Sequence, residues 1–145
     1  MKPLKVLLVE DNEADAELTR ETLDGSRLPV DLRVAADGTE ALDILSGRLG
    51  GERTEPDLIL LDLNLPGLGG RQVLAAIKAD DHLKSIPVVV LTSSDAESDV
   101  VASYQAGANC FITKPCDFTA YQQVVEALEG FWFCIATLPR GGANV

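Results

Sequence analysis

The chain has 145 residues, a length that fits one globular domain with a short appendage. Its hydrophobic fraction of 46% can build a single core, and its formal net charge of −11 argues against direct binding of nucleic acid, which needs clustered lysine and arginine. No run of about 18 apolar residues occurs, and the short apolar stretch near the start runs into two acids. We therefore expect a cytoplasmic protein with neither a membrane span nor a signal peptide.

Strand and helix patterns alternate through the first half of the chain. Apolar runs predict buried strands, alternating polar and apolar residues predict a half-buried strand, and apolar residues at helical spacing predict helices. In chain order these are a buried strand at 5–9, a helix capped by Asn12 or Asp11, a half-buried strand at 31–35, a helix led by Thr39, and a buried strand at 57–61. The inward faces of the two helices are predicted to carry Ala14, Leu18 and Thr22, and Ala41, Leu42, Leu45 and Leu49. Gly50 to Glu55 reads as a polar surface loop whose role the sequence does not disclose.

The second half continues the same alternation. Its predicted elements are a loop at 64–70, a helix with Val73, Leu74 and Ile77 inward, a buried strand at 88–91 ending at Thr92, a helix at 97–105, a short strand at 110–112, and a last helix with Phe118, Tyr121, Val125 and Leu128 on one face. The three cysteines, Cys110, Cys116 and Cys134, show no C-x-x-C spacing, so each is predicted to be a small buried residue without a disulfide or zinc.

The alternation itself predicts the fold. Strands and helices alternate five times, and three strands are apolar on both faces, which indicates a parallel sheet covered by helices on both sides. Five such units in this length fit a flavodoxin-like (βα)5 three-layer α/β sandwich with a parallel five-stranded sheet in the order 2-1-3-4-5.

Residues with reactive or charged side chains stand where the predicted strands end. Glu10 and Asp11 follow the first strand, Asp62 follows the third, Thr92 ends the fourth, and Lys114 follows the fifth. The functional crevice of an open α/β sheet lies outside the carboxyl ends of its strands, so we expect these side chains to converge. Taken singly, Asp11 could be a helix cap, Thr92 a chance strand end and Lys114 part of a turn; their joint occurrence favours a site.

Three carboxylates pressed together need a compensating cation. Oxygen ligands of this kind suit Mg²⁺, which we expect to be held by Asp11 and Asp62, by Glu10 through water, and by the backbone carbonyl of Asn64. The alternative reading of the acidic charge is a solvated surface. With a cation bound, Asp62 is the predicted nucleophile that accepts a phosphoryl group, while Lys114 offsets its charge.

Four segments of the chain carry a resemblance to a known family. They are VLLVEDN at 6–12, PDLILLDLNLP at 56–66, VVVLTS at 88–93 and ITKP at 112–115. Together they resemble the receiver domains of bacterial two-component systems, over roughly residues 4–128. The resemblance implies a sensor histidine kinase as phosphoryl donor, Asp62 as phosphoacceptor, Glu10 and Asp11 as metal acids, Thr92 as a switch hydroxyl and Lys114 as an ion-pairing residue.

The resemblance also implies how phosphorylation is read out. The hydroxyl of Thr92 would move toward the phosphoryl group, and an aromatic residue, here Phe111, would turn inward. Phenylalanine stands where tyrosine is frequent in the family, so no phenol hydrogen bond can report the state. Small polar residues, Asn64 and Ser94, lie two positions after Asp62 and Thr92 and leave room for a hydrolytic water. We therefore expect self-phosphorylation and autodephosphorylation with a finite lifetime rather than enzymatic turnover of a substrate.

The last seventeen residues, 129–145, are predicted to form an extension beyond a receiver domain at 1–128, too short for an output domain. Their apolar string around Trp132 could pack on the domain itself or cover a partner, and we favour a partner surface. The FW and TLP motifs resemble the stand-alone regulators paired with bacterial phytochromes. That resemblance implies a phytochrome-type kinase and a homodimer involving Tyr104, Phe111 and Trp132.

Two other functions are considered. A phosphohydrolase that works through an aspartyl-phosphate needs a second acid two positions after the nucleophile, where this chain has Asn64. A degenerate receiver would dock partners without phosphorylation, and the intact acids, Thr92 and Lys114 weigh against it.

Overall fold

The computed structural model describes residues 3–26, 28–47, 55–133 and 136–139. Strands and helices alternate along the chain, as the apolar patterns predict. The elements are β1 (Leu4–Val9), α1 (Glu13–Asp24), β2 (Val30–Ala35), α2 (Gly38–Ser46), β3 (Leu58–Leu61), α3 (Gly70–Ala79), β4 (Val88–Thr92), α4 (Glu97–Gln105), β5 (Cys110–Thr113), α5 (Phe118–Leu128) and a π-helical turn η1 (Glu129–Phe133). Within these ranges, no helix is long and apolar enough to cross a membrane.

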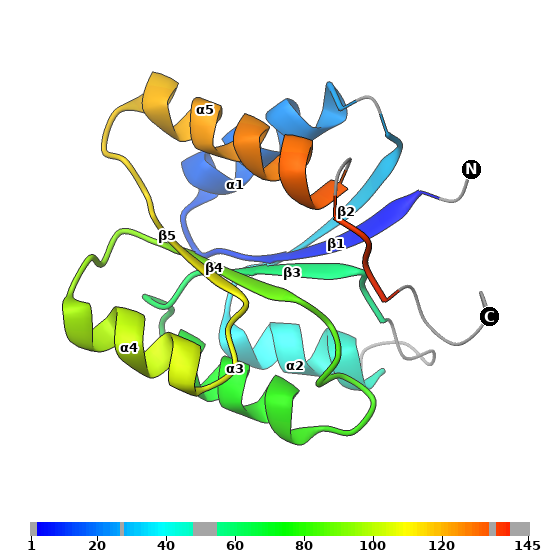
Figure 1. The fold of residues 1–145 in the computed structure, drawn as a ribbon, viewed down its shortest axis with the longest axis vertical. Helices are drawn as coiled ribbons and strands as arrows, with labels where there is room; N and C mark the ends of the chain where they lie inside the picture. Colours follow the sequence, from blue (N-terminus) through cyan, green and yellow to red (C-terminus); the bar gives the residue numbers. More distant parts are fainter. Residues whose placement is uncertain (1–2, 27, 48–54, 134–135, 140–145) are drawn as a thin grey trace.

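The five strands form one parallel sheet in the order β2-β1-β3-β4-β5, which confirms the predicted flavodoxin-like fold. Helices α1 and α5 cover one face of the sheet, and α2, α3 and α4 cover the other (Figure 1). The molecule therefore has three layers, and the carboxyl ends of all five strands lie along one edge.

Alternate side chains of the strands feed two separate cores. In β1, Val6 and Leu8 pack in the core beneath α1 and α5, whereas Leu7 and Val9 pack in the core beneath α2 and α3. Because successive side chains of a strand point to opposite faces, a strand covered on both faces must be apolar throughout. This explains why the central strands are continuous apolar runs.

The structure confirms only part of the predicted inward faces of the helices. Val73, Leu74 and Ile77 of α3 are all buried, but Ala14 of α1 and Phe118 of α5 are exposed. Both exposed residues lie in the first turn of their helix. Helical periodicity selects the direction of a side chain, but it does not say how far the neighbouring layer extends along the helix axis.

The other predicted buried positions have mixed outcomes. Six are buried: Leu18, Ala41, Leu45, Tyr121, Val125 and Leu128. Thr22 and Leu42 are half-buried, Cys110 is half-buried, and Cys116 is exposed, contrary to its predicted burial. Leu49, Cys134 and the loop at 50–54 lie outside the described residues.

Beyond α5, the η1 turn folds back on the core rather than leaving it. Phe133 is buried, and half-buried Trp132 packs against the core beneath α1 and α5. Phe131 is 51% exposed and contacts the Trp132 ring edge-to-face, with 5.5 Å between ring centroids. Residues 131–133 thus pack in part on their own domain, and the predicted partner surface stays a prediction.

Candidate functional site

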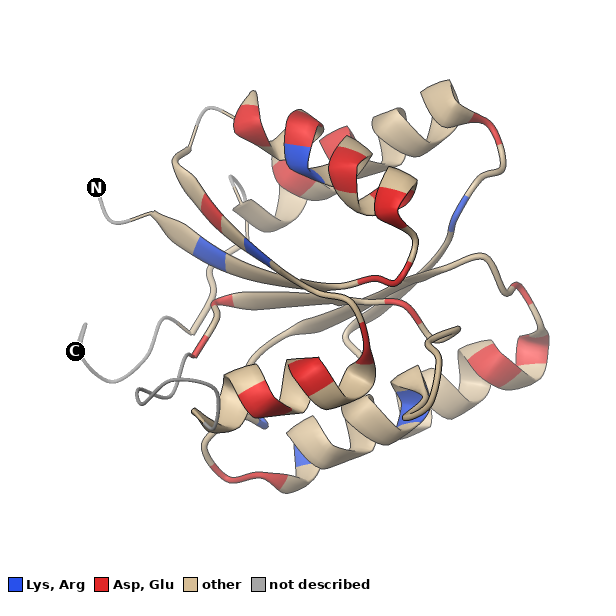
Figure 2. Ribbon diagram, turned by 180° about the vertical axis from the view of Figure 1, so that it is seen from behind, with Lys and Arg blue, Asp and Glu red and all other residues tan. Residues whose placement is uncertain are grey.

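The predicted site residues meet at the carboxyl edge of the sheet. Glu10 follows β1, Asp62 follows β3, Thr92 ends β4 and Lys114 follows β5, and all four are buried. The parallel register sets Val9 opposite Leu61 and Thr92 opposite Thr113, so the residues that follow these strands are neighbours. Acidic residues follow β1 and β3 and occupy much of α1 (Figure 2).

Lys114 is the centre of this arrangement. Its ammonium group donates hydrogen bonds to Oε1 of Glu10, to Oδ2 of Asp15 at 3.0 Å and to Oδ2 of Asp62 at 3.1 Å. An ammonium has three N–H donors, and here each one meets a different carboxylate. The lysine side chain is only 7% exposed, so these charge-assisted bonds form largely away from water.

Three carboxylates gather beside the lysine. Glu10, Asp11 and Asp62 can each offer one oxygen atom, and these atoms lie within 4.8 Å of one another. Glu10 and Asp62 are buried, whereas Asp11 is exposed, so the cluster opens to solvent on one side. All three donors are hard oxygen ligands, and this donor set fits a divalent cation such as Mg²⁺.

Burial and charge shift the pKa values of the site in different directions. Burial raises the pKa of Glu10 to about 7, against the opposing effect of the Lys114 ammonium. Burial acts in the same sense on Asp62, but the Asn64 N–H and the Lys114 charge outweigh it and hold the pKa of Asp62 below its ordinary value. The pKa of Lys114 is raised, because its carboxylate partners outweigh its burial. Asp62 is therefore ionised at neutral pH, as its predicted role of nucleophile requires.

Asn64 contacts both Asp62 and Thr92. Its backbone N–H donates to Oδ1 of Asp62 at 3.0 Å, and its side-chain Nδ2 donates to Oγ1 of Thr92 at 3.2 Å and to Oγ of Ser93 at 3.3 Å. Thr92 is fully buried. The predicted metal-binding role of the Asn64 carbonyl stays a prediction.

The loop after β3 depends on a glycine. Gly70 begins α3, and its N–H donates to the carbonyl of Leu63 at 3.2 Å. A Cβ added at Gly70 would overlap the carbonyl oxygen of Asp62 and the Cα of Leu63. Only glycine lets the start of α3 approach Asp62 this closely, so this residue helps to position the acid.

The residues predicted for the switch and the dimer divide between two sides of the sheet. Phe111 packs against the core on the α2 and α3 side, and its N–H donates to the hydroxyl of half-exposed Tyr104 at 3.1 Å. Trp132 packs against the opposite core. The structure therefore brings Tyr104 and Phe111 into contact and sets Trp132 apart from the pair.

Sequence reasoning missed Asp15 as a member of the site. This residue lies in the first turn of α1, and its carboxylate bonds to Lys114. A signal was present, because Asp15 stands four residues after Asp11, and a helix capped by Asn12 begins at this edge of the sheet.

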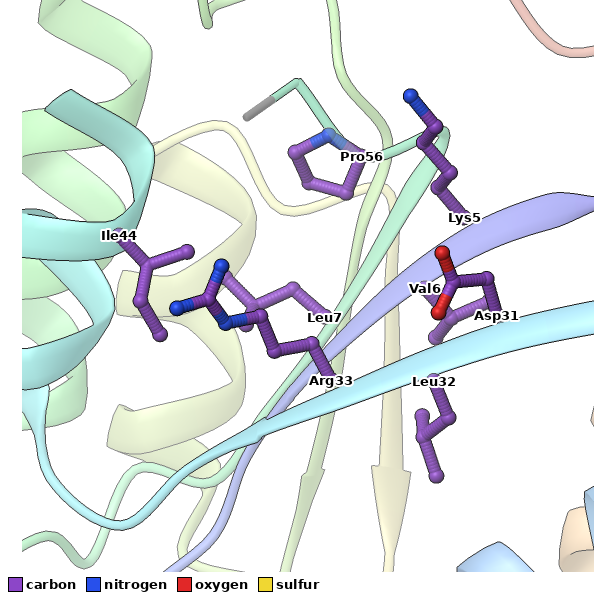
Figure 3. Close-up of a pocket in the computed structure, with 8 residues that line it drawn as sticks. All are labelled: Lys5, Val6, Leu7, Asp31, Leu32, Arg33, Ile44 and Pro56. Atoms are coloured by element: carbon purple, nitrogen blue, oxygen red, sulfur yellow. The ribbon is translucent and has the colours of Figure 1, made fainter. Parts of the chain in front are cut away.

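A hollow of about 370 Å³ lies at the other end of the sheet (Figure 3). Lys5, Arg33, Ile44 and Pro56 are among its lining residues. The lining residues come from β1, from β2, from α2 and from the loop just before β3, so none of the site residues lies in this hollow.

The parallel five-stranded sheet, with buried acids, a threonine and a lysine at its carboxyl edge, defines a receiver-type signalling domain. A family model described as "Response regulator receiver domain" matches residues 6–126, and the chain belongs to this family. The predicted response-regulator function is thereby confirmed, and neither the phosphohydrolase nor the docking alternative is favoured.

Individual relatives agree with the family match. The chain is 45% identical to response regulator Rcp1 of Synechocystis sp. over 138 residues, which cover 94% of each protein. The Mn²⁺-bound crystal structure of Rcp1 matches 94% of this chain and 99% of that one, with a TM-score of 0.91 at 45% identity. The phosphorylated cyanobacterial phytochrome response regulator RcpA matches 95% of this chain and 99% of that one, with a TM-score of 0.89 at 46% identity. The chain is thus homologous to phytochrome response regulators.

Proposed function

We propose that the protein accepts a phosphoryl group on Asp62 from a sensor histidine kinase, with Mg²⁺ held by Glu10, Asp11, Asp62 and the backbone carbonyl of Asn64. The observation that carries this proposal is the trio of carboxylates with oxygen atoms within 4.8 Å of one another beside the buried ammonium of Lys114. Such a site combines a nucleophile with fixed positive charge for the incoming phosphoryl oxygens.

The chemistry follows from these groups. A carboxylate oxygen of Asp62 attacks the phosphorus atom, forms a new P–O bond, and expels the donor, which leaves with the electrons of the broken bond. From phosphohistidine the leaving group is the imidazole, whose freed nitrogen takes up a proton from solvent, and from acetyl phosphate it is acetate. Lys114 turns its ammonium from the Asp62 carboxylate toward the phosphoryl oxygens. Bound Mg²⁺ would offset more of the charge that gathers on those oxygens.

Thr92 and Phe111 are the proposed switch. The Thr92 hydroxyl leaves the Asn64 amide, its partner at 3.2 Å, and donates to the phosphoryl group. Phe111, half-buried beside the α2 and α3 core, then turns further inward by packing alone, since it has no hydroxyl group. Water reaching the phosphoryl group past Asn64 and Ser94 ends the signal by autodephosphorylation.

The proposed kinase partner is a phytochrome photoreceptor. This assignment draws on the likeness to RcpA, whose structure is described as that of a phytochrome response regulator in its phosphorylated form. The choice of Mg²⁺ among divalent cations rests on the oxygen donor set and on its abundance as a partner of phosphates. The proposed location of the protein is the cytoplasm, where kinases that use ATP act.

The proposed assembly is a homodimer that uses Tyr104, Phe111 and Trp132, with residues 129–145 as an extension of a receiver domain at 1–128. Exposed apolar side chains beside both sets of residues support it, since Val101 of α4 is 47% exposed and Phe131 of η1 is 51% exposed. A groove of about 260 Å³ beside Trp132 has almost wholly apolar lining residues from β5, α5 and η1. Light scattering on the protein and on Tyr104→Asp tests this assembly, and a monomer under all conditions would refute it.

Acetyl phosphate with Mg²⁺ tests the central proposal. Intact mass should show one added phosphoryl group on the native protein, and none on Asp62→Asn or in the presence of a chelator. A time course after removal of the donor should show its loss. Absence of the adduct, even with a histidine kinase as donor, would exclude phosphorylation as the signal.

A further inference from the structure

Asp15 differs from the other two carboxylates that bind Lys114. Glu10 and Asp62 belong both to the lysine site and to the three-residue carboxylate cluster, whereas Asp15 belongs only to the lysine site. A cation bound in the cluster would therefore share Glu10 and Asp62 with the ammonium group. Asp15 would then be the one carboxylate that bonds to Lys114 without also binding the cation.

The charges of the site make this partner necessary. The four carboxylates Glu10, Asp11, Asp15 and Asp62 carry a formal −4, and Lys114 carries +1, which leaves −3. A divalent cation in the cluster approaches a buried ammonium that bonds to the same two acids. Two cations repel each other strongly where water is scarce, so the ammonium is held best by a carboxylate that does not belong to the cluster.

The position of Asp15 suits that task. Its side chain is 31% exposed and reaches Lys114 from the first turn of α1, whereas Glu10 and Asp62 follow strands. The backbone of Asp15 has its own partners, because its N–H donates to Oδ1 of Asn12 and its carbonyl accepts from Thr19. The carboxylate is thus free of any capping function among these contacts and can be altered without removing them.

We propose that Asp15 is a positioning residue that holds the Lys114 ammonium when a divalent cation occupies the Glu10, Asp11 and Asp62 cluster, and so strengthens binding of that cation. This inference rests on the proposed function, since it requires the cluster to bind a metal. It adds a residue of α1 to the site and explains how one lysine and one metal ion can use the same two acids.

Metal binding by an isosteric variant tests this role. Calorimetric titration with Mg²⁺ or Mn²⁺ should show roughly tenfold weaker binding by Asp15→Asn, the low end of the range for residues that orient metal ligands. Glu17→Gln is the matched control, because it removes the same charge from α1 at an exposed position two residues away, which points to another side of the helix. We expect about a twofold change or less for the control, since exposed distant charges are screened.

Nuclear magnetic resonance of the ¹⁵N-labelled lysine side chain separates positioning from simple charge. The Lys114 ammonium, buried and bonded to three carboxylates, should give a sharp signal with metal bound, and Asp15→Asn should broaden or shift it. An unchanged lysine signal, or equal metal binding by Asp15→Asn and Glu17→Gln, would overturn the inference. Failure of the unaltered protein to bind either metal would overturn the proposed function itself.

Discussion

The amide of Asn64 donates from Nδ2 to the hydroxyl of Thr92 at 3.2 Å, across the space between the loop after β3 and the end of β4. The same residue donates its backbone N–H to Asp62. In the structure described here, the proposed switch hydroxyl is therefore already bonded to a group beside the proposed phosphoacceptor. The hydroxyl must exchange this partner before it can contact a phosphoryl group.

Asn64→Ala should speed phosphorylation by acetyl phosphate. The variant removes a bond that holds Thr92 in the resting arrangement, and one hydrogen bond contributes about 0.5–1.5 kcal/mol, which corresponds to a rate increase of about two- to tenfold. Ser93→Ala is the control, because it removes the other acceptor of the same amide and leaves the bond to Thr92. Slower labelling of Asn64→Ala would mean that the amide assists the transfer instead.

The free energy of unfolding of the metal-free protein should fall as pH rises from about 5 to about 7, because of Glu10. Its pKa is about 7 in the folded protein against an ordinary value of 4.5, so the folded state holds its proton over that interval and the unfolded state does not. A raised carboxyl pKa contributes stability that is present below pH 4.5 and is lost as pH passes through 7. The pKa shifts of Asp62 and Lys114 change stability only outside this pH range: the first below about pH 4 and the second above about pH 10.

Glu10→Gln should remove this pH dependence. Urea denaturation with a chelator present should show the variant more stable than the native protein at pH 8 by about 1–3 kcal/mol, with little difference at pH 5. A native protein whose stability stays flat between pH 5 and pH 8 would contradict the raised pKa.

Gly70→Ala should destabilise the protein by about 2 kcal/mol and impair metal binding. The new methyl group would overlap the backbone of Asp62 and Leu63, and relief of such overpacking requires a backbone shift at the site itself. Gly130→Ala is the matched control, because a Cβ there meets nothing within 4 Å. Chemical denaturation and calorimetry measure the two effects, and equal stability of both variants would argue against the close approach.

Tyr121→Phe should cost about 1 kcal/mol of stability. The Tyr121 hydroxyl is buried and lies 3.0 Å from Oγ1 of Thr19, so its removal loses one buried hydrogen bond between α5 and α1. Tyr104→Phe makes the same change at a half-exposed position and should cost less, since water can replace the lost partner. If urea denaturation shows a larger loss of stability for Tyr104→Phe than for Tyr121→Phe, the buried hydrogen bond of Tyr121 is not the more stabilising of the two.

The sequence by itself determined the order of the elements and the edge where the site lies. The apolar runs at β1, β3 and β4 indicate strands covered on both faces, and such strands must be parallel and crossed over by helices. In a parallel sheet the residues that follow the strands share one edge. Glu10, Asp62, Thr92 and Lys114 could therefore be placed together without knowledge of any distance.

Tertiary structure alone decided which of these groups touch. The bonds from Lys114 to Asp15 and from Asn64 to Thr92 depend on how far a helix turn or a loop reaches over the sheet edge. The position of Trp132 on the core beneath α1 and α5, away from Phe111, depends on how the chain turns after α5. Periodicity records the face on which a side chain lies, but contacts between elements depend on the packing of layers that are distant in sequence.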